Sequence, residues 1–232
     1  MTSQAMAAPE ARARWGPICG VAFVVFLVVS FFIGSTPNTN KSPAYLLAWY
    51  NKSSHKTQLE ISTLLADIAV VFAIFWFTYL RDRWGRTDLG ARLAPALLAG
   101  AIILAGGGLA FSGANIALLD SPKHMTPDTA QALNFIASDI GAAAIVIGVS
   151  ITMWAAGFII LKTRVLPVWM AWVSFVLAVV GLAGPIGFFA FLATGIWILI
   201  VAYFMWRFEQ SLPGSGDAVE DRSAVTSGGT PA

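Results

Sequence analysis

The sequence has few charged residues. Aspartate, glutamate, lysine and arginine make up 11% of the 232 residues, whereas a soluble domain has about 25%. So few charges cannot cover the surface of a water-soluble globule, and 57% of the residues are hydrophobic, with a mean hydropathy of +0.74. These values predict a protein whose outer surface contacts hydrocarbon, with the lipid bilayer as its first partner.

Residue patterns for most kinds of chemistry are missing as well. The one cysteine, Cys19, excludes an internal disulfide and a cysteine-rich metal site. A long basic tract is absent, so nucleic acid is not an expected partner. The two histidines, His55 and His124, fall between apolar runs, and no nucleophile elbow, phosphate loop or HExxH helix occurs. We therefore expect a protein that is not an enzyme and has no cofactor or metal.

Six apolar runs are close to the length of about 17–25 residues that a membrane-crossing helix needs. They are Pro17–Gly34, Glu60–Leu80, Leu93–Leu119, Gln131–Leu161, Pro167–Gly184 and Gly187–Trp206. The runs predict an all-α, polytopic transmembrane helical bundle with about six spans, occupying residues 16–207. Pro17, Pro95 and Pro167 each fall in the first turn of a run, where the missing N–H costs little, and this supports the boundaries.

The basic residues predict the orientation. Every arginine of the bundle lies on one side, at the ends of the runs: Arg12, Arg14, Arg81, Arg83, Arg86, Arg92, Arg164 and Arg207, with Lys162 among them. The opposite side has only lysines: Lys41, Lys52, Lys56 and Lys123. The positive-inside rule places the arginine side in the cytoplasm, which gives an N-in/C-in protein of the bacterial inner (plasma) membrane.

The two ends of the chain are expected to lie outside the bundle. Residues 1–15 form a cytoplasmic N-terminal segment, and residues 208–232, rich in Gly, Ser, Ala and acidic residues, form a disordered cytoplasmic tail. The first run resembles a signal peptide, but Gly34-Ser35-Thr36 is a poor cleavage site, so we expect an uncleaved anchor. The connection Ser35–Gln58 contains an apolar, aromatic segment, Tyr45–Tyr50, expected as a loop anchored at the outer interface, with a substrate lid as the alternative.

Two acidic residues lie well inside apolar runs, Asp67 in the second and Asp139 in the fourth. A charged group at membrane depth costs about 2.5–3.5 kcal/mol on insertion scales, so such residues usually face protein or water. With a rise of about 1.5 Å per residue, both lie roughly 10 Å inside the outer ends of their helices. Four polar side chains come near the same level: Ser112 and Asn115 in the third run, and Asn134 and Ser138 in the fourth.

These six residues predict a polar pocket that opens to the outer face and is built from the second, third and fourth helices. The function that it indicates is binding or transport of a small molecule or ion, with Asp67 and Asp139 as the ligand or proton site. The alternative is structural. The two acids are then hydrated near the interface, or protonated and bonded to Asn115 as interhelical contacts.

Stripes of small residues predict close helix packing. Ala137, Gly141, Ala144 and Gly148 form one stripe in the fourth run, and Gly106, Ala110 and Gly113 form another in the third. Small residues let helix backbones approach closely, and we expect these contacts to be intramolecular rather than a dimer face. The alternative function is accordingly a non-catalytic membrane scaffold or assembly partner, whose helices contact a membrane protein partner.

One segment carries a resemblance. The basic turn Lys162-Thr163-Arg164 precedes Leu166-Pro167-Val168-Trp169-Met170-Ala171-Trp172 at the start of the fifth run. This pattern, with the order of elements over most of the bundle, resembles uncharacterised six-helix integral membrane proteins of actinobacteria, a domain of unknown function. The family has no established activity or binding residues, so the resemblance implies the fold and leaves function to the residues themselves.

Overall fold

The computed structural model describes residues 7–34, 36–38, 40–120, 124–183 and 187–210, with side chains from Trp15 onward except at residue 188. Every regular element within these ranges is a helix. The longer ones are α1 (Ala7–Ile33), α3 (Ser53–Trp84), α4 (Asp88–Asp120), α6 (Ala142–Thr163) and α8 (Gly187–Gln210); the shorter ones are α2 (Pro43–Tyr50), α5 (Pro127–Phe135), the π-helix η2 (Ile136–Gly141) and α7 (Val168–Gly181). The predicted disordered tail lies outside the described residues from 211 onward, and residues 208–210 belong to α8.

Five stretches are long and apolar enough to cross a membrane. They are Trp15–Ile33, Ser53–Trp84, Asp88–Asp120, Pro127–Thr163 and Phe189–Gln210. The all-helical, membrane-protein class predicted from the sequence is confirmed at this level. The fifth predicted run forms α7, whose 14 residues extend about 21 Å, less than the roughly 30 Å of a hydrocarbon core. The number of six spans therefore stays a prediction.

Several helices begin earlier than the apolar runs indicate. Pro17 and Pro95, expected in first turns, lie inside helices because α1 begins at Ala7 and α4 at Asp88. Hydropathy marks only the apolar part of a helix, whereas a helix that projects beyond the hydrocarbon continues through polar residues. Pro167 is the N-cap of α7, close to its predicted position.

The aromatic segment Tyr45–Tyr50 is the helix α2 rather than a loop. Ser42 caps it by accepting a hydrogen bond from the Tyr45 amide, and Pro43 occupies its first position. The Tyr50 side chain is buried and its hydroxyl donates to Asn134 Oδ1 at 2.8 Å, which joins α2 to α5. Burial raises the pKa of the Tyr50 hydroxyl, so it stays a proton donor.

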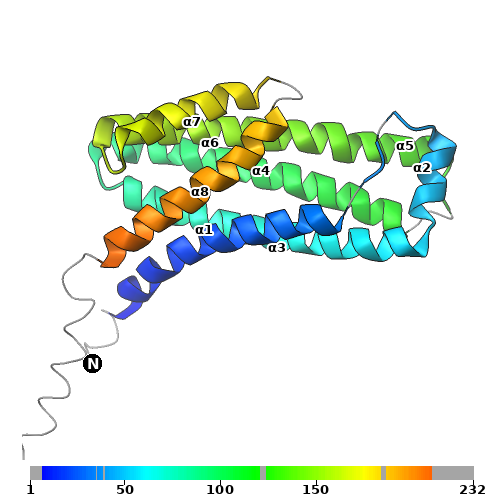
Figure 1. The fold of residues 1–232 in the computed structure, drawn as a ribbon, viewed down its shortest axis with the longest axis horizontal. Helices are drawn as coiled ribbons and strands as arrows, with labels where there is room; N and C mark the ends of the chain where they lie inside the picture. The colour runs from blue at the N-terminus through cyan, green and yellow to red at the C-terminus, as the bar shows by residue number, and fades with distance from the viewer. Residues whose placement is uncertain (1–6, 35, 39, 121–123, 184–186, 211–232) are drawn as a thin grey trace, which may run out of the picture.

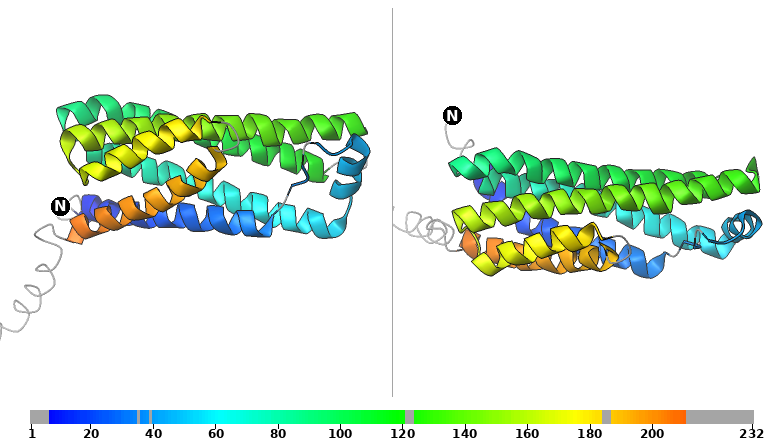
Figure 2. Two further views of the ribbon diagram at one scale, coloured as in Figure 1. Left: turned by 45° about the horizontal axis from the view of Figure 1, so that its top comes forward. Right: turned by 90° about the horizontal axis from the view of Figure 1, so that it is seen from above.

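The main helices form a ring. α1 packs on α3, α3 on α4, α4 on α6, α6 on α7, α7 on α8, and α8 returns to α1. Figure 1 shows α1 beginning and α8 ending at the same end of the molecule, which we call the basic end because the connections α3–α4 and α6–α7 and the last turn of α8 bring Arg81, Arg83, Arg86, Lys162, Arg164 and Arg207 there. The short helices α2 and α5 lie at the opposite end, the cap end (Figure 2).

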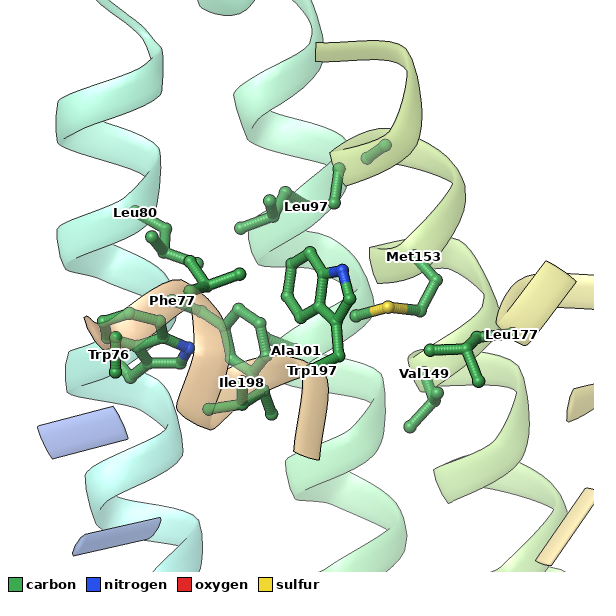
Figure 3. Close-up of a cluster of buried hydrophobic side chains, with 14 of the residues drawn as sticks. Trp76, Phe77, Leu80, Leu97, Ala101, Val149, Met153, Leu177, Trp197 and Ile198 are labelled. Carbon is green, nitrogen blue, oxygen red and sulfur yellow. The ribbon is translucent and has the colours of Figure 1, made fainter. Parts of the chain in front are cut away.

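The half of the ring toward the basic end is filled by large side chains. Trp197 of α8 is buried and points between α3, α4 and α6, where it lies among Phe77, Leu97 and Met153 (Figure 3). A second, smaller cluster around Tyr50 holds the cap end together. The stretch between these clusters is where the ring is less completely filled.

An ion pair fixes the end of α8 to α3. Glu209 Oε1 accepts a hydrogen bond of 2.9 Å from the Tyr79 hydroxyl and one of 2.8 Å from Arg83 Nε, and it also pairs with the second guanidinium nitrogen. The side chains of Arg83 and Glu209 are only 11% and 10% exposed. This cluster closes the ring at the basic end.

Glycines set the closest helix contact, between α4 and α6. A Cβ added to Gly148 would lie 2.6 Å from the carbonyl oxygen of Gly100, and one added to Gly107 would lie 2.8 Å from that of Gly141. The small-residue stripe predicted around Gly141 and Gly148 does pack within the molecule. The other stripe does not: Gly106 and Gly113 are exposed, and a Cβ on either would meet nothing within 4 Å in the described structure. Because Gly106, Gly107 and Gly108 are consecutive, the sequence does not show which of them faces α6. In the structure it is Gly107.

Candidate functional site

A cavity of about 360 Å³ lies in the half of the ring toward the cap end. Its walls come from α1, α3, α4, η2 and α6. It exists because α7 ends at Gly181 and α8 begins at Gly187, so this hairpin covers only the half of the ring near the basic end (Figure 1). Phe191, in the second turn of α8, lines the end of the cavity nearest the hairpin.

Most of the cavity wall is apolar, and the polar groups gather at one end. Leu27, Ala69, Val70 and Ile145 are among the apolar lining residues. The lining hydroxyls belong to Ser30, Thr36, Ser62 and Ser138, and none of the described lining residues is charged. From Phe23 to Gly34, the lining residues of α1 extend over about 16 Å at the rise of an α-helix. The cavity is thus an elongated apolar slot with a polar end near Gly34 and Thr36, and we call this end the mouth.

The predicted site residues divide into separate contacts. Ser112 Oγ donates a 2.6 Å hydrogen bond to Asp67 Oδ1, which joins α4 to α3. Asn115, one turn nearer the cap end, is fully buried, and neither of its amide atoms has a hydrogen-bond partner among the described residues. Thr63 lies four residues before Asp67 on the same face of α3 and is also buried, with its hydroxyl oxygen unpaired in the described part of the chain.

These four residues form a polar layer between α3 and α4, which we call the Asp67 layer. The bond between Ser112 and Asp67 fixes the register of the two antiparallel helices, so Thr63 and Asn115 come to the same level. Sequence reasoning missed Thr63, although its spacing of four residues before Asp67 was a usable signal. The role of the layer as an ion or proton site stays a prediction.

The remaining predicted residues, Asn134, Ser138 and Asp139, lie on α5 and η2. Asn134 is buried and accepts the Tyr50 hydrogen bond, while its Nδ2 atom has no partner in the described residues. Ser138 donates to the carbonyl oxygen of Asn134 at 2.6 Å and lines the cavity. Asp139 is exposed on the π-helical turn. The three residues at which a pocket was expected to converge, Asp67, Asn115 and Asp139, are not among its described lining residues.

A metal site finds no support in the side chains. The structure places no three His, Cys, Asp or Glu residues together among the residues it describes. His55 instead stacks on Trp49, with ring centroids 4.3 Å apart.

No family model, curated protein or solved structure matches the chain. The function is therefore argued from the cavity and the Asp67 layer themselves.

Proposed function

We propose that the protein is a non-enzymatic, six-crossing protein of the bacterial cell membrane, with both termini in the cytoplasm, that binds a small molecule with an apolar chain in the cavity between α1, α3, α4 and α6. The clustering of arginine at the basic end supports this orientation under the positive-inside rule. The cap end is then the outer face. We further propose that the chain is related to the six-helix membrane proteins of actinobacteria that the segment from Leu166 to Trp172 resembles.

The depth of the cavity supports a ligand that comes from the outer leaflet. A hydrocarbon core of about 30 Å corresponds to about 20 residues of helix. Counted along α3 from Leu80 at the basic end, this distance reaches Glu60, next to the cavity mouth at Ser62. Val70, also in the wall, then lies near the middle of the bilayer. The cavity thus covers the thickness of one leaflet, with its polar mouth at the water interface.

The size of the cavity is the observation that carries the proposal. An apolar space of about 360 Å³ within a helix bundle is far larger than the voids that close-packed protein interiors contain. We infer that this space is filled by an apolar chain. A volume in the lower part of the ligand-pocket range of about 300–1,000 Å³ suits a single chain.

The alternative, a scaffold or assembly partner, is favoured by one observation. Gly106 and Gly113 leave part of the exposed face of α4 without side chains, and such faces allow a second transmembrane helix to approach closely. A partner subunit that depends on this face would be lost from the complex on Gly106→Leu, with ligand binding in the cavity unchanged.

Binding of labelled methyl dodecanoate to the purified full-length protein in detergent tests the proposed function. Ala66 lines the cavity, so Ala66→Phe places a ring in the slot and is expected to weaken saturable binding by roughly tenfold or more. Leu64→Phe is the matched control because Leu64 is 60% exposed on the same helix. It should bind like the unmodified protein.

A second blocking variant, Ala142→Phe, places a ring in the cavity from α6. If both variants lose binding, a local distortion of α3 by Ala66→Phe cannot be the cause. Size-exclusion chromatography and far-ultraviolet circular dichroism establish that each variant is folded. If folded Ala66→Phe and Ala142→Phe both bind the ester as well as Leu64→Phe does, the cavity is not the binding site and the proposed function is wrong.

A further inference from the structure

Three of the four hydroxyl groups that line the cavity have already used their protons. Ser62 Oγ donates to the carbonyl oxygen of Ser30 at 3.0 Å, and Ser30 Oγ donates to that of Leu27 at 2.7 Å. Ser138 Oγ donates to the carbonyl oxygen of Asn134 at 2.6 Å. A hydroxyl has one proton and two acceptor lone pairs. These three oxygens can therefore accept a hydrogen bond from a ligand but cannot donate one.

The end of α1 adds acceptors at the same level. α1 ends at Ile33, beside the lining residue Gly34. The last carbonyl groups of a helix point beyond its end and carry the negative end of its dipole. Gly34 also packs so closely on Ser62 that an added Cβ would collide with the serine side chain, which keeps Ser62 at this helix end. The mouth is thus a cluster of acceptors with a partial negative charge.

Charged groups near the mouth do not change this character. Lys56 and Glu60 lie on either side of the lining residue Leu59 along α3 and pair with each other at 3.7 Å. Both side chains are about half exposed to solvent. Thr36 lies at the exposed edge, where water can accept its proton. An anionic head group would face oxygen lone pairs and no cationic side chain among the described lining residues. A cationic head group would face no carboxylate among them. Burying either charge without a partner is costly.

We propose that the natural ligand is a neutral, single-chain amphiphile whose head group is an alcohol, held with its chain in the apolar slot and its hydroxyl donating to the oxygens at the Ser30–Ser62 mouth. This inference rests on the proposed function, since it names the head group of the molecule that fills the same cavity. The orientation is that of a lipid in the outer leaflet, so the ligand enters sideways from the membrane without turning over.

A series of ligands with one chain and different head groups tests the proposal. Dodecanol has a donor, methyl dodecanoate is neutral and accepts only, and dodecanoate near pH 8 is an anion. The full-length protein in detergent is titrated with each, in competition with labelled methyl dodecanoate, and Ala66→Phe measures partition into the micelle. We expect dodecanol to bind about fivefold more tightly than the ester, the effect of one hydrogen bond, and dodecanoate to bind more weakly than both.

A mouth variant checks that the selectivity comes from these oxygens. Ser30→Ala with Ser62→Ala removes two hydroxyl oxygens, while the carbonyl of Ser30 keeps its bond from the Gly34 amide. The preference for dodecanol over the ester should fall to less than about twofold. Leu64→Ser, on the exposed face, is the matched control and should keep the full preference.

The outcomes separate the two proposals. If all three ligands bind alike, or dodecanoate binds most tightly, and Ala66→Phe abolishes binding, the alcohol head group is wrong and the cavity still binds a chain. If the preference for dodecanol survives in the double mouth variant, the Ser30–Ser62 assignment is overturned. If Ala66→Phe and Ala142→Phe leave the binding of every ligand intact, the proposed function itself fails.

Discussion

Replacing Gly148 with alanine is expected to separate α4 from α6. The added methyl group would lie 2.6 Å from the carbonyl oxygen of Gly100 and 2.9 Å from Leu104 Cα, and closer still to the Leu104 amide nitrogen. These are backbone atoms of a long helix and cannot rotate aside as a side chain would. Overpacking of this kind typically costs about 1–3 kcal/mol.

Gly106→Ala is the matched control for this prediction. Gly106 lies in α4 on the exposed face, where an added Cβ meets nothing within 4 Å in the described structure. Both substitutions replace a helical glycine with alanine, which improves helix propensity by up to about 1 kcal/mol, so this gain cancels in their difference. The free energy of unfolding of Gly148→Ala should therefore be about 1–3 kcal/mol below that of Gly106→Ala.

Equilibrium unfolding in mixed micelles, with increasing amounts of a denaturing detergent, measures this difference. Loss of near-ultraviolet circular dichroism, which reports packing of the aromatic core, is the suitable signal because helices persist in such detergents. If the two variants unfold within about 0.5 kcal/mol of each other, α4 and α6 do not meet at backbone contact and the glycine argument is wrong. Gly107→Ala, which meets the carbonyl oxygen of Gly141 at 2.8 Å, should behave like Gly148→Ala.

Two further predictions concern the polar contacts between helices. Asp67→Asn keeps an acceptor for the Ser112 hydroxyl and removes the charge, so in the same unfolding assay we expect a change within about 1 kcal/mol; a larger loss would mean that the fold needs the carboxylate itself. Glu209→Gln leaves the nearly buried Arg83 guanidinium without a counter-charge and should lower the free energy of unfolding by about 3 kcal/mol. Its control is Glu60→Gln, which breaks a half-exposed pair and should cost less than about 0.5 kcal/mol.

The helical class and most of the helix positions followed from the sequence because they depend on a one-dimensional property. A run of apolar residues has few ways to satisfy its backbone in hydrocarbon other than a helix. The same reasoning misplaced the starts of α1 and α4 because charged residues precede their apolar runs, Arg12 and Arg14 in α1 and Asp88 and Arg92 in α4. It also missed η2. A π-helical turn differs from an α-helix by a single hydrogen-bond shift, which the composition around Asp139 does not reveal.

The polar residues illustrate a second limit. Apolar-run analysis found Asp67 and Asp139 at similar depths, but depth does not fix the face of the helix. Asp67 accepts a hydrogen bond from Ser112, whereas Asp139 is exposed on η2. Asn115 and Ser112 share a face because they lie three residues apart within a regular helix, and this pairing was predictable.

The cavity could not have been predicted, since its lining residues are of the same kind as those that form the core. What distinguishes the two regions is the length of α7, which at 14 residues is too short to cover the half of the ring toward the cap end. Near the basic end Trp197 fills the space between α3, α4 and α6. Phe191 lines the cavity, and only one further turn of α8, back to Gly187, lies beyond it toward the cap end. In the proposed orientation, the cavity that α7 leaves uncovered spans the outer leaflet. Its lining is apolar at the depth of the hydrocarbon and accepts hydrogen bonds at the level of the water interface. In the proposed function, the shortness of α7 accounts both for the space that holds the chain and for the direction in which the chain points.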